Sequence, residues 1–387
     1  MAATRLRAAL IGAGRRGSQQ AATLSELPEL FEFAAVCDPN SDAVRKAVEQ
    51  YGLRGYTSVS ELFANEKLDV VVIATPPDVH HIGVKAAANH GVNVLVETPL
   101  GLTRAMMDAL AEAAERGRIV VEVGENYGRR PSEALNRGAV AAGLIGKLLH
   151  MSVFNGAANQ ESAYHIVSLL RAYAGGADVG EVQAIARTSQ ADGAATETWV
   201  EAVLSLEDGV SATCNYVTSW TAPHRWGRPR IASIEGTAGY VVSEEAGARN
   251  RLHCVENGEQ KDYPMQVSDG DAIETTFSYA ARPELRVANP FPTLRTDVDP
   301  RTVCDGIGRA AELMSLHRAI TENVPVEYGV AAGYRSQEIG LAIMEAARLG
   351  HPISSHLDDE TPWERTEHER FRARYDADPI ADVDKLM

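Results

Sequence analysis

Three glycines near the start of the chain constrain its fold more than any other feature. The segment LIGAGRRG places Gly12, Gly14 and Gly17 in the spacing GxGxxG, after a strand-like apolar run and before a helical stretch. In such a turn the first glycine permits the tight bend, the second lets a pyrophosphate approach the backbone, and the third lets the helix pack on the strand. The motif predicts a dinucleotide site at a helix N-terminus, lined also by Arg15 and Arg16. The alternative is a glycine turn that binds no ligand.

Strand-like and helix-like blocks alternate over the N-terminal third of the chain. Short β-rich runs at residues 7–11, 33–37, 69–75, 92–96 and 119–123 are separated by helical stretches, including residues 78–90 and 103–116. This order predicts parallel strands joined by helical crossovers, and the apolar runs VVVIAT and VNVLVE fit strands buried on both faces. We therefore expect an α/β protein whose residues 1–128 form a Rossmann domain with a doubly wound parallel sheet.

One acidic residue indicates which dinucleotide binds. Asp38 ends the second predicted strand, in AAVCDPN, where a carboxylate accepts hydrogen bonds from the adenosine ribose. A carboxylate there repels a 2′-phosphate, and no Arg or Lys follows immediately. The sequence therefore predicts NAD as the cofactor in preference to NADP.

The pattern changes after about residue 147. Longer strands with period-2 alternation follow, and residues 198–216 read as a hairpin around the turn Glu207-Asp208-Gly209. Helical blocks at 162–174, 305–322 and 331–349 are suited to cover one face of the sheet. We expect a substrate-binding α+β domain over residues 129–355, with a mostly antiparallel open sheet through which the protein forms a homo-oligomer. Residues 258–300 contain several prolines and are predicted to be irregular. The charged extension, residues 356–387, is predicted to form a helix on the surface or against a partner subunit.

Composition excludes several classes of protein. The chain of 387 residues has 53 Asp and Glu against 37 Lys and Arg, a formal net charge of -16, which argues against a general nucleic-acid binder. The four cysteines are scattered without a CxxC pair, so neither a disulfide framework nor a zinc or other metal site is predicted. No apolar run approaches the length of a membrane span. The N-terminal segment superficially resembles a signal peptide but lacks an A-x-A cleavage site, so we expect a cytoplasmic protein without membrane partners.

Several segments together resemble the glucose–fructose oxidoreductase, inositol dehydrogenase and rhizopine-catabolism superfamily. Residues 74–102 resemble its third-to-fourth strand unit, with Thr75, Pro76 and His80 at the usual positions. Gly124 and Asn126 resemble its fifth-strand GxN, and AYHIVSLLRAYAG resembles the helix that carries its active-site histidine. The resemblance implies an NAD-dependent enzyme acting on a small carbohydrate. The cofactor-binding residues predicted from the motif and the resemblance are Gly12, Gly14, Arg15, Arg16, Gly17, Asp38, Thr75, Pro76, His80, Glu97, Thr98 and Asn126.

The chain departs from that superfamily at one position that matters for catalysis. The superfamily usually has Glu-Lys-Pro after the fourth strand, where the lysine polarises the substrate hydroxyl; this chain has Glu97-Thr98-Pro99. A threonine hydroxyl cannot replace an ammonium group in that task. The NAD-dependent glycosidase branch also lacks the lysine, and its Glu-Asn after the fifth strand resembles Glu125-Asn126. In that branch, oxidation at sugar C3 makes the C2 proton acidic, the C1 substituent leaves, water adds and the hydride returns.

The resemblance also assigns the acid–base groups. His165 occupies the position of the superfamily's histidine and would act as acid or base toward the sugar hydroxyl; the alternative is a core histidine. Glu161 lies one helical turn earlier and would pair with His165 or cap the helix. Glu125 would act on the substrate or pair with Arg129 or Arg130 at the surface. The predicted catalytic residues are His165, Glu125, Tyr164, Glu161 and Tyr127, the two tyrosines having packing as the alternative.

A basic segment suggests the substrate's charge. Residues 209–234 contain no Asp or Glu, and HRWGRPR supplies several cations. Guanidinium groups bind carboxylates, phosphates and sulfonates bidentately. The segment therefore predicts a site for an anionic sugar, with a solvated or subunit-contacting loop as the alternative. Its predicted substrate-binding residues are His224, Arg225, Trp226, Arg228 and Arg230.

Three functions remain open from the sequence. The Thr98 departure and the Glu125-Asn126 match favour redox-assisted glycoside cleavage. Net NAD-dependent dehydrogenation of a sugar or polyol is the first alternative. Binding of NAD for a regulatory or structural purpose is the second.

Overall fold

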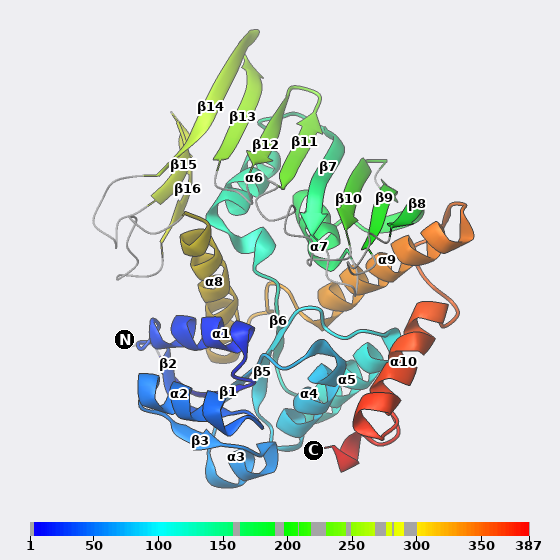
Figure 1. The fold of residues 1–387 in the computed structure, drawn as a ribbon. Coiled ribbons are helices and arrows are strands. Elements are labelled where there is room, and N and C mark those ends of the chain that lie inside the picture. Colours follow the sequence, from blue (N-terminus) through cyan, green and yellow to red (C-terminus); the bar gives the residue numbers. More distant parts are fainter. Residues whose placement is uncertain are drawn as a thin grey trace. The chain divides into compact units, whose positions relative to one another are not determined.

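The chain forms two compact units (Figure 1). The computed structural model describes residues 4–157, 163–189, 197–207, 209–217, 230–244, 249–267, 276–280, 282–289 and 300–386. Unit 1 comprises Met1–Asn126, Arg309–Tyr334 and Glu360–Met387, and unit 2 comprises Tyr127–Gly308 and Arg335–Asp359. Each unit therefore combines segments that lie far apart in the sequence.

Unit 1 is built on a six-stranded sheet in which every pair of neighbours is parallel. Its order is β3-β2-β1-β4-β5-β6. The strands are β1 (Leu6–Ile11), β2 (Phe31–Cys37), β3 (Arg54–Tyr56), β4 (Val70–Ile73), β5 (Asn93–Glu97) and β6 (Val121–Gly124). All four residues of β4 are buried, as expected for a central strand covered on both faces. The predicted doubly wound parallel sheet is confirmed.

Five helices connect these strands. They are α1 (Arg15–Ser25), α2 (Ser41–Tyr51), α3 (Val59–Asn65), α4 (His80–Asn89) and α5 (Arg104–Gly117). The side chains of Asn40, Ser58 and Thr103 cap α2, α3 and α5 by accepting hydrogen bonds from backbone N–H groups of the first turn. Because α1, α2, α4 and α5 each start a few residues after a strand ends, their N-termini gather at the carboxyl edge of the sheet.

A segment from late in the chain completes unit 1. Glu122, buried in β6, accepts a hydrogen bond of 2.5 Å from Ser315 Oγ of α8 (Pro300–Glu322) and one of 3.2 Å from the backbone N–H of Tyr328. These bonds satisfy a carboxylate that would otherwise be buried without partners. The sequence-based division at residues 128 and 355 assigned these residues to the second domain, because contacts this distant along the chain leave no local signal.

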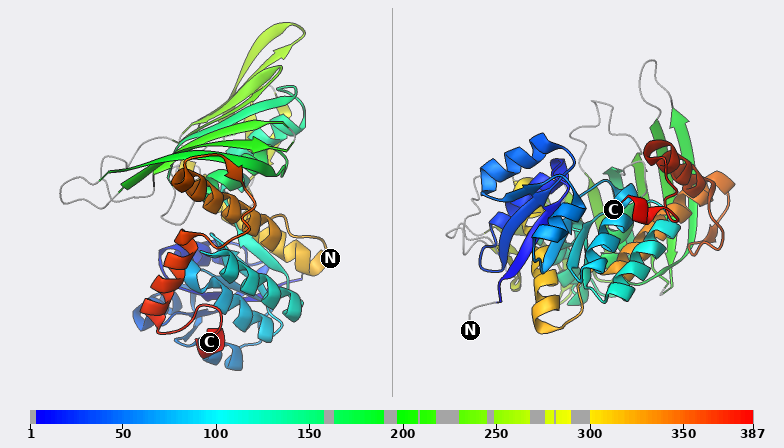
Figure 2. Two further views of the ribbon diagram at one scale, coloured as in Figure 1. Left: turned by 90° about the vertical axis from the view of Figure 1, so that its right-hand side faces the viewer. Right: turned by 90° about the horizontal axis from the view of Figure 1, so that it is seen from below.

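The charged C-terminal segment also folds onto unit 1 (Figure 2). It forms α10 (Pro362–Tyr375), which starts with a capping box between Thr361 and Glu364. Glu364 also accepts two hydrogen bonds from the Arg104 guanidinium and one from its backbone N–H, at 2.9–3.1 Å. Phe371 packs with Ile82 and Met106. The expected helix is present, and its apolar side covers α4 and α5.

Acid should weaken the attachment of this tail through His81. His81 Nε2 lies 2.7 Å from the carbonyl oxygen of Pro379, and burial lowers the pKa of His81 to about 4. The unfolded chain binds a proton at His81 near pH 6.5, whereas the folded chain does not until about pH 4, so stability falls as the pH drops through that window. We predict that this one group removes about 2–3 kcal/mol of unfolding free energy between pH 7 and 4.5.

Urea unfolding at the two pH values checks this prediction, with His81→Gln as the comparison. Glutamine donates to the same carbonyl but does not titrate, so the variant should lose correspondingly less stability than wild type. An identical pH dependence in both proteins would show that His81 does not contribute.

Unit 2 carries an eleven-stranded sheet ordered β16-β15-β14-β13-β12-β11-β7-β10-β9-β8-β17. Among its described pairs, β10 and β7 are parallel and the others antiparallel, which confirms the mostly antiparallel sheet. The strands are β7 (Leu148–Ala157), β8 (Val179–Ser189), β9 (Glu197–Leu206), β10 (Ser211–Val217), β11 (Ile231–Gly236), β12 (Gly239–Glu244), β13 (Arg249–Glu256), β14 (Glu259–Val267), β15 (Thr276–Tyr279), β16 (Arg282–Ala288) and β17 (Ile353–Ser354). Strands β9 and β10 form the predicted hairpin.

The prediction of irregular structure over residues 258–300 is wrong for three of these strands. Pro264 lies inside β14, opposite Arg251 of β13, and its carbonyl oxygen accepts a 3.0 Å hydrogen bond from the backbone N–H of Ala280. A proline removes one donor from a strand but keeps its acceptor, so the ladder passes through it. The prolines of this segment therefore indicated irregular structure where the chain forms strands.

The two faces of the unit 2 sheet differ. Along β10 the residues alternate in burial, with Ala212, Cys214 and Tyr216 buried. The helices α6 (Pro131–Ala141), α7 (Tyr164–Tyr173) and α9 (Val330–Leu349) cover this side, and Tyr216 contacts Met344 of α9. Large apolar side chains are exposed on the strands, among them Phe154, Ile185, Trp199, Val203 and Tyr240. Among the described helices, none is both long and apolar enough to cross a bilayer.

Candidate active site

The glycine loop between β1 and α1 has the shape that a pyrophosphate requires. Gly12 has φ +96°, and a Cβ there would lie 2.7 Å from the backbone of Ala74. A Cβ on Gly17 would lie 1.9 Å from the carbonyl oxygen of Gly12, so the helix packs too closely for any side chain. Around Gly14 no atom lies within 4 Å of the Cβ position, which leaves open space against the backbone. The three glycines therefore meet the three requirements of a dinucleotide loop, and Arg15 beside them is exposed.

Asp38 lies next to this loop at the end of β2. Its Oδ2 accepts a 2.6 Å hydrogen bond from the backbone N–H of Ala13, and its Oδ1 accepts one of 2.8 Å from Asn40. Both bonds hold the carboxylate at the carboxyl edge, beside the glycine loop. From this position a carboxylate can accept hydrogen bonds from the hydroxyl groups of an adenosine ribose.

We predict that the protein binds NAD more tightly than NADP, and that Asp38→Ala narrows the difference. The carboxylate would accept hydrogen bonds from the ribose and repel a 2′-phosphate, effects worth roughly 10-fold or more together. Asp38→Asn keeps the size and one acceptor oxygen but removes the charge, so it should relieve the repulsion with less damage to the loop. Fluorescence titration with both dinucleotides measures the ratio. Equal affinity of the wild type for NAD and NADP would contradict the assignment.

His80 fixes the neighbouring loops. Its Nε2 lies 3.0 Å from the carbonyl oxygen of Thr75 after β4, and its Nδ1 lies 3.0 Å from that of Pro99 after β5. Burial lowers the pKa of His80, while the two carbonyl oxygens oppose that shift. His80 thus contacts the backbone of two loops at the carboxyl edge of the sheet. Thr75 Oγ1 is buried and has no hydrogen-bond partner within the described part of the chain, and Pro76 is exposed.

Glu97 is the centre of a buried network at the end of β5. Its Oε1 accepts hydrogen bonds from Arg16 Nε at 2.7 Å and Gln20 Nε2 at 2.6 Å. Arg16 Nη2 also donates to Asn126 Oδ1 at 3.3 Å, just beyond β6. Thr98 follows Glu97 directly, so a hydroxyl lies at the strand end where the resemblance leads one to expect lysine. Sequence reasoning missed Gln20, which has no motif to mark it.

Glu125 also belongs to unit 1. It is 4% exposed, and its backbone N–H donates to the carbonyl oxygen of Val123 at 2.7 Å. Glu125 is therefore not at the surface, where the alternative drawn from the sequence had placed it.

In unit 2, Tyr127 and His165 form a stacked pair. Their ring centroids lie 4.3 Å apart with an interplanar angle of 14°. Tyr164 meets the edge of His165 at 5.6 Å and 84°. Tyr164 is buried, whereas His165 is only half-buried. The structure therefore brings three of the predicted catalytic residues together, with Tyr127 and His165 half-buried and Tyr164 buried.

Two guanidinium groups lie over the same tyrosine ring. The Cζ atoms of Arg130 and Arg230 lie 3.8 Å and 4.7 Å from the centroid of Tyr127. Arg130 Nε donates to Asp305 at 2.5 Å, and Arg230 Nη2 lies 3.3 Å from Glu133 Oε1. Each cation near the ring therefore has its own carboxylate.

Glu133 anchors this cluster. Its side chain is fully buried and also accepts hydrogen bonds from the hydroxyl of Tyr173, from Asn136 Nδ2 at 2.9 Å and from Ser243 Oγ at 3.3 Å. Burial and the Glu133 charge raise the pKa of Tyr173. The carboxylate thus joins α6, α7 and the sheet behind the Tyr127–His165 pair.

The remaining predicted residues lie outside the described ones: Glu161, His224, Arg225, Trp226 and Arg228. Of the predicted anion-binding group, Arg230 is described, and its partner is Glu133.

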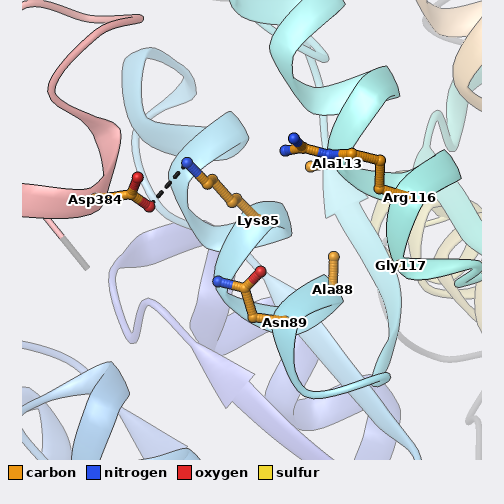
Figure 3. A pocket seen from close by; sticks show the side chains of 7 residues that line it. All are labelled: Lys85, Ala88, Asn89, Ala113, Arg116, Gly117 and Asp384. Atoms are coloured by element: carbon orange, nitrogen blue, oxygen red, sulfur yellow. Dashed lines mark ion pairs between the residues drawn. The ribbon is translucent and has the colours of Figure 1, made fainter.

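A polar recess of about 380 Å³ on unit 1 lies elsewhere (Figure 3). Lys85 pairs with Asp384 of the tail at 2.8 Å across it. Asn89 ends α4 and Gly117 ends α5, so this recess lies at the edge where the strands begin, opposite the glycine loop. It is therefore separate from the dinucleotide loop. Its lining residues are Lys85, Ala88, Asn89, Ala113, Arg116, Gly117 and Asp384.

Several known proteins resemble part of the chain in sequence. The rhizopine catabolism protein MocA of Rhizobium meliloti is 35% identical over 153 residues, 39% of this chain and 47% of that protein. A glycosyl hydrolase family 109 protein of Shewanella amazonensis is 34% identical over 157 residues, 38% of this chain and 34% of that protein. These alignments cover less than half of each relative.

Two further likenesses extend over most of the chain. The levoglucosan dehydrogenase of Pseudarthrobacter phenanthrenivorans is 24% identical over 88% of this chain and 96% of its own length. A crystal structure of an Agrobacterium radiobacter oxidoreductase with NAD+ and L-tartaric acid has a TM-score of 0.72 at 18% identity, covering 91% of this chain and 99% of that one. The structural likeness shows that the fold is shared.

The family match agrees with the geometry of the glycine loop. Residues 6–125 match the family described as the oxidoreductase family with an NAD-binding Rossmann fold. This region contains the glycine loop and Asp38, and its match is to an NAD-binding Rossmann domain of the Gfo/Idh/MocA type, with NAD as the cofactor.

Proposed function

We propose that this protein is an NAD-dependent carbohydrate enzyme that cleaves a glycoside through transient oxidation of the sugar at C3. The observation that carries the proposal is Thr98, which directly follows β5 where the resemblance leads one to expect lysine. With a hydroxyl in place of an ammonium group, polarisation of the substrate hydroxyl has to come from other groups. The similarity to a glycosyl hydrolase family 109 protein supports the same choice.

The chain's own groups suit the proton transfers. When bound, NAD accepts a hydride from C3 and returns it later. His165 would take the proton of the C3 hydroxyl, and the stacked Tyr127 would hold the imidazole in place. Once C3 is a ketone, a carboxylate or phenolate such as Glu125 or Tyr164 can remove the C2 proton, and the C1 substituent departs. Water then adds at C1 while the base returns a proton to C2, and His165 would return its proton to the C3 oxygen when the ketone is reduced.

Net dehydrogenation is the second candidate function. It is supported by the levoglucosan dehydrogenase, whose alignment covers 96% of its length. A panel of aryl glycosides and free sugars separates the two candidates when aglycone release and the absorbance of reduced nicotinamide are followed together. Glycoside cleavage predicts aglycone without accumulating NADH. NADH formed in proportion to product favours dehydrogenation. If neither aglycone nor NADH is formed, the result favours a non-catalytic role for NAD.

The charge of the sugar is a finer part of the proposal. Arg225 and Arg228, with His224 and Trp226, form a basic segment suited to a carboxylate, phosphate or sulfonate. Arg230 is a weaker member of this set because Glu133 already balances its charge. If the segment binds an anionic sugar, Arg225→Ala and Arg228→Ala should lose discrimination between charged and neutral substrates. Unchanged discrimination in both variants would remove this part of the proposal.

The open sheet of unit 2 is proposed as the contact between copies of the chain. Exposed aromatic and aliphatic residues such as Phe154, Trp199 and Tyr240 give it an apolar character that monomeric proteins seldom display as a group. Light scattering after size-exclusion chromatography should give a multiple of 41.6 kDa. Trp199→Glu should shift that mass toward the monomer, and a monomeric wild type would contradict the proposal.

A further inference from the structure

Arg16 occupies one of the unspecified positions of the glycine motif, yet its side chain bridges three strand ends. It starts α1 after β1, it donates through Nε to Glu97 at the end of β5, and through Nη2 to Asn126 beyond β6. Its Nη1 also lies 3.3 Å from Gln19 Oε1. Glu97 is 3% exposed and receives Gln20 Nε2 as well, so the guanidinium is held by a rigid, buried partner.

This contact decides the orientation of the Asn126 amide. A guanidinium group carries only donors, so the Asn126 atom that faces it has to be the carbonyl oxygen. The opposite orientation would set N–H against N–H. The Nδ2 group is therefore turned away from Arg16, and no residue in the described ranges accepts a hydrogen bond from it. Asn126 thus offers a donor and not an acceptor.

The strand order indicates what this donor meets. Asp38 follows β2, on one side of β1, and marks the adenosine side of the dinucleotide. Asn126 follows β6, beyond β4 and β5 on the other side. A dinucleotide that lies across the carboxyl edge, with its pyrophosphate at the glycine loop, therefore brings its nicotinamide half toward β5 and β6. That half offers the carboxamide oxygen and the ribose oxygens as acceptors, and ADP-ribose, which keeps the ribose but lacks the carboxamide, distinguishes between them.

We propose that Arg16 is a positioning residue, which orients Asn126 so that its Nδ2 donates to the carboxamide oxygen of the nicotinamide. The inference concerns NAD binding by unit 1 alone. It can be tested by titration without turnover, so it stands or falls independently of the proposed glycosidase reaction.

The test compares NAD with ADP-ribose, which lacks the nicotinamide. Asn126→Ala should weaken NAD by roughly 3- to 10-fold, the range for one neutral hydrogen bond, and leave ADP-ribose within about 2-fold of wild type. Arg16→Lys keeps a cation beside Glu97 but loses the planar fork that reaches Asn126, so it should show the same selective loss. Arg116→Lys, the same change at an exposed arginine on the opposite edge of the sheet, should leave the affinities for both NAD and ADP-ribose unchanged.

A double-mutant cycle shows whether Arg16 acts through Asn126. In the Asn126→Ala background, Arg16→Lys should cause no further loss of NAD affinity relative to ADP-ribose. Equal losses in both backgrounds would mean that Arg16 acts by a separate contact and would overturn the proposal. An equal loss for NAD and ADP-ribose in Asn126→Ala would place the contact away from the carboxamide and would also overturn it. Thermal unfolding of each variant confirms that the fold is intact.

Discussion

Replacing His165 with alanine is expected to lower the rates of both sugar oxidation and glycoside cleavage by roughly 10²- to 10⁴-fold, as for the loss of a general acid–base group. The expectation follows from an imidazole that stacks on Tyr127 at 4.3 Å and remains half-buried beside the buried Tyr164. Because His165 belongs to unit 2, the variant should retain its affinity for NAD. Steady-state rates and NAD titration measure the two quantities.

The matched variant for this test is Tyr127→Phe. Phenylalanine keeps the ring on which His165 stacks and removes only the hydroxyl, so it separates orientation of the imidazole from chemistry at the phenol. A small effect would assign Tyr127 to orientation, and a loss similar to that of His165→Ala would assign it to proton transfer. Full activity of His165→Ala would contradict the role proposed for the imidazole.

Replacing Glu133 with leucine is expected to destabilise the protein by about 3–5 kcal/mol, the range for removing one partner of a buried ion pair. The change leaves Arg230, whose side chain is 11% exposed, without its carboxylate. It also removes the acceptor of Tyr173, Asn136 and Ser243. Urea unfolding measures the loss.

Glu133→Gln is the control for this substitution. Glutamine keeps the shape and one acceptor oxygen, so its cost should be smaller than that of leucine. A loss below about 1 kcal/mol for Glu133→Leu would mean that the buried network adds little to stability, contrary to this account.

The sequence predicted the parts of the fold that local patterns specify. The strand–glycine–helix unit around Gly12 and the apolar β4 and β5 have short-range signals, and all were placed correctly. Strands β14 to β16 were missed because Pro264 reads as a break, while the ladder around it depends on partners distant in the chain.

The sequence predicted the residues of the candidate site better than it predicted the contacts between them. The spacing of Gly14 and Asp38 predicts a dinucleotide site. The sequence predicts Tyr127 and His165 as separate site residues, and the structure shows that their rings stack. The pairs Arg16–Glu97 and Arg104–Glu364 join residues 81 and 260 positions apart. No periodicity or motif connects such residues, so only the folded chain reveals them.

The C2 hydrogen of the sugar tests the central claim most directly. Oxidation at C3 makes the neighbouring C2–H a proton α to a ketone, so a glycosidase of this kind exchanges it with solvent during turnover. It also needs only catalytic NAD, because the hydride comes back. In heavy water we predict deuterium at C2 of the released sugar and no stoichiometric NADH. Stoichiometric NADH together with an unlabelled C2 would contradict the glycosidase account and establish net dehydrogenation.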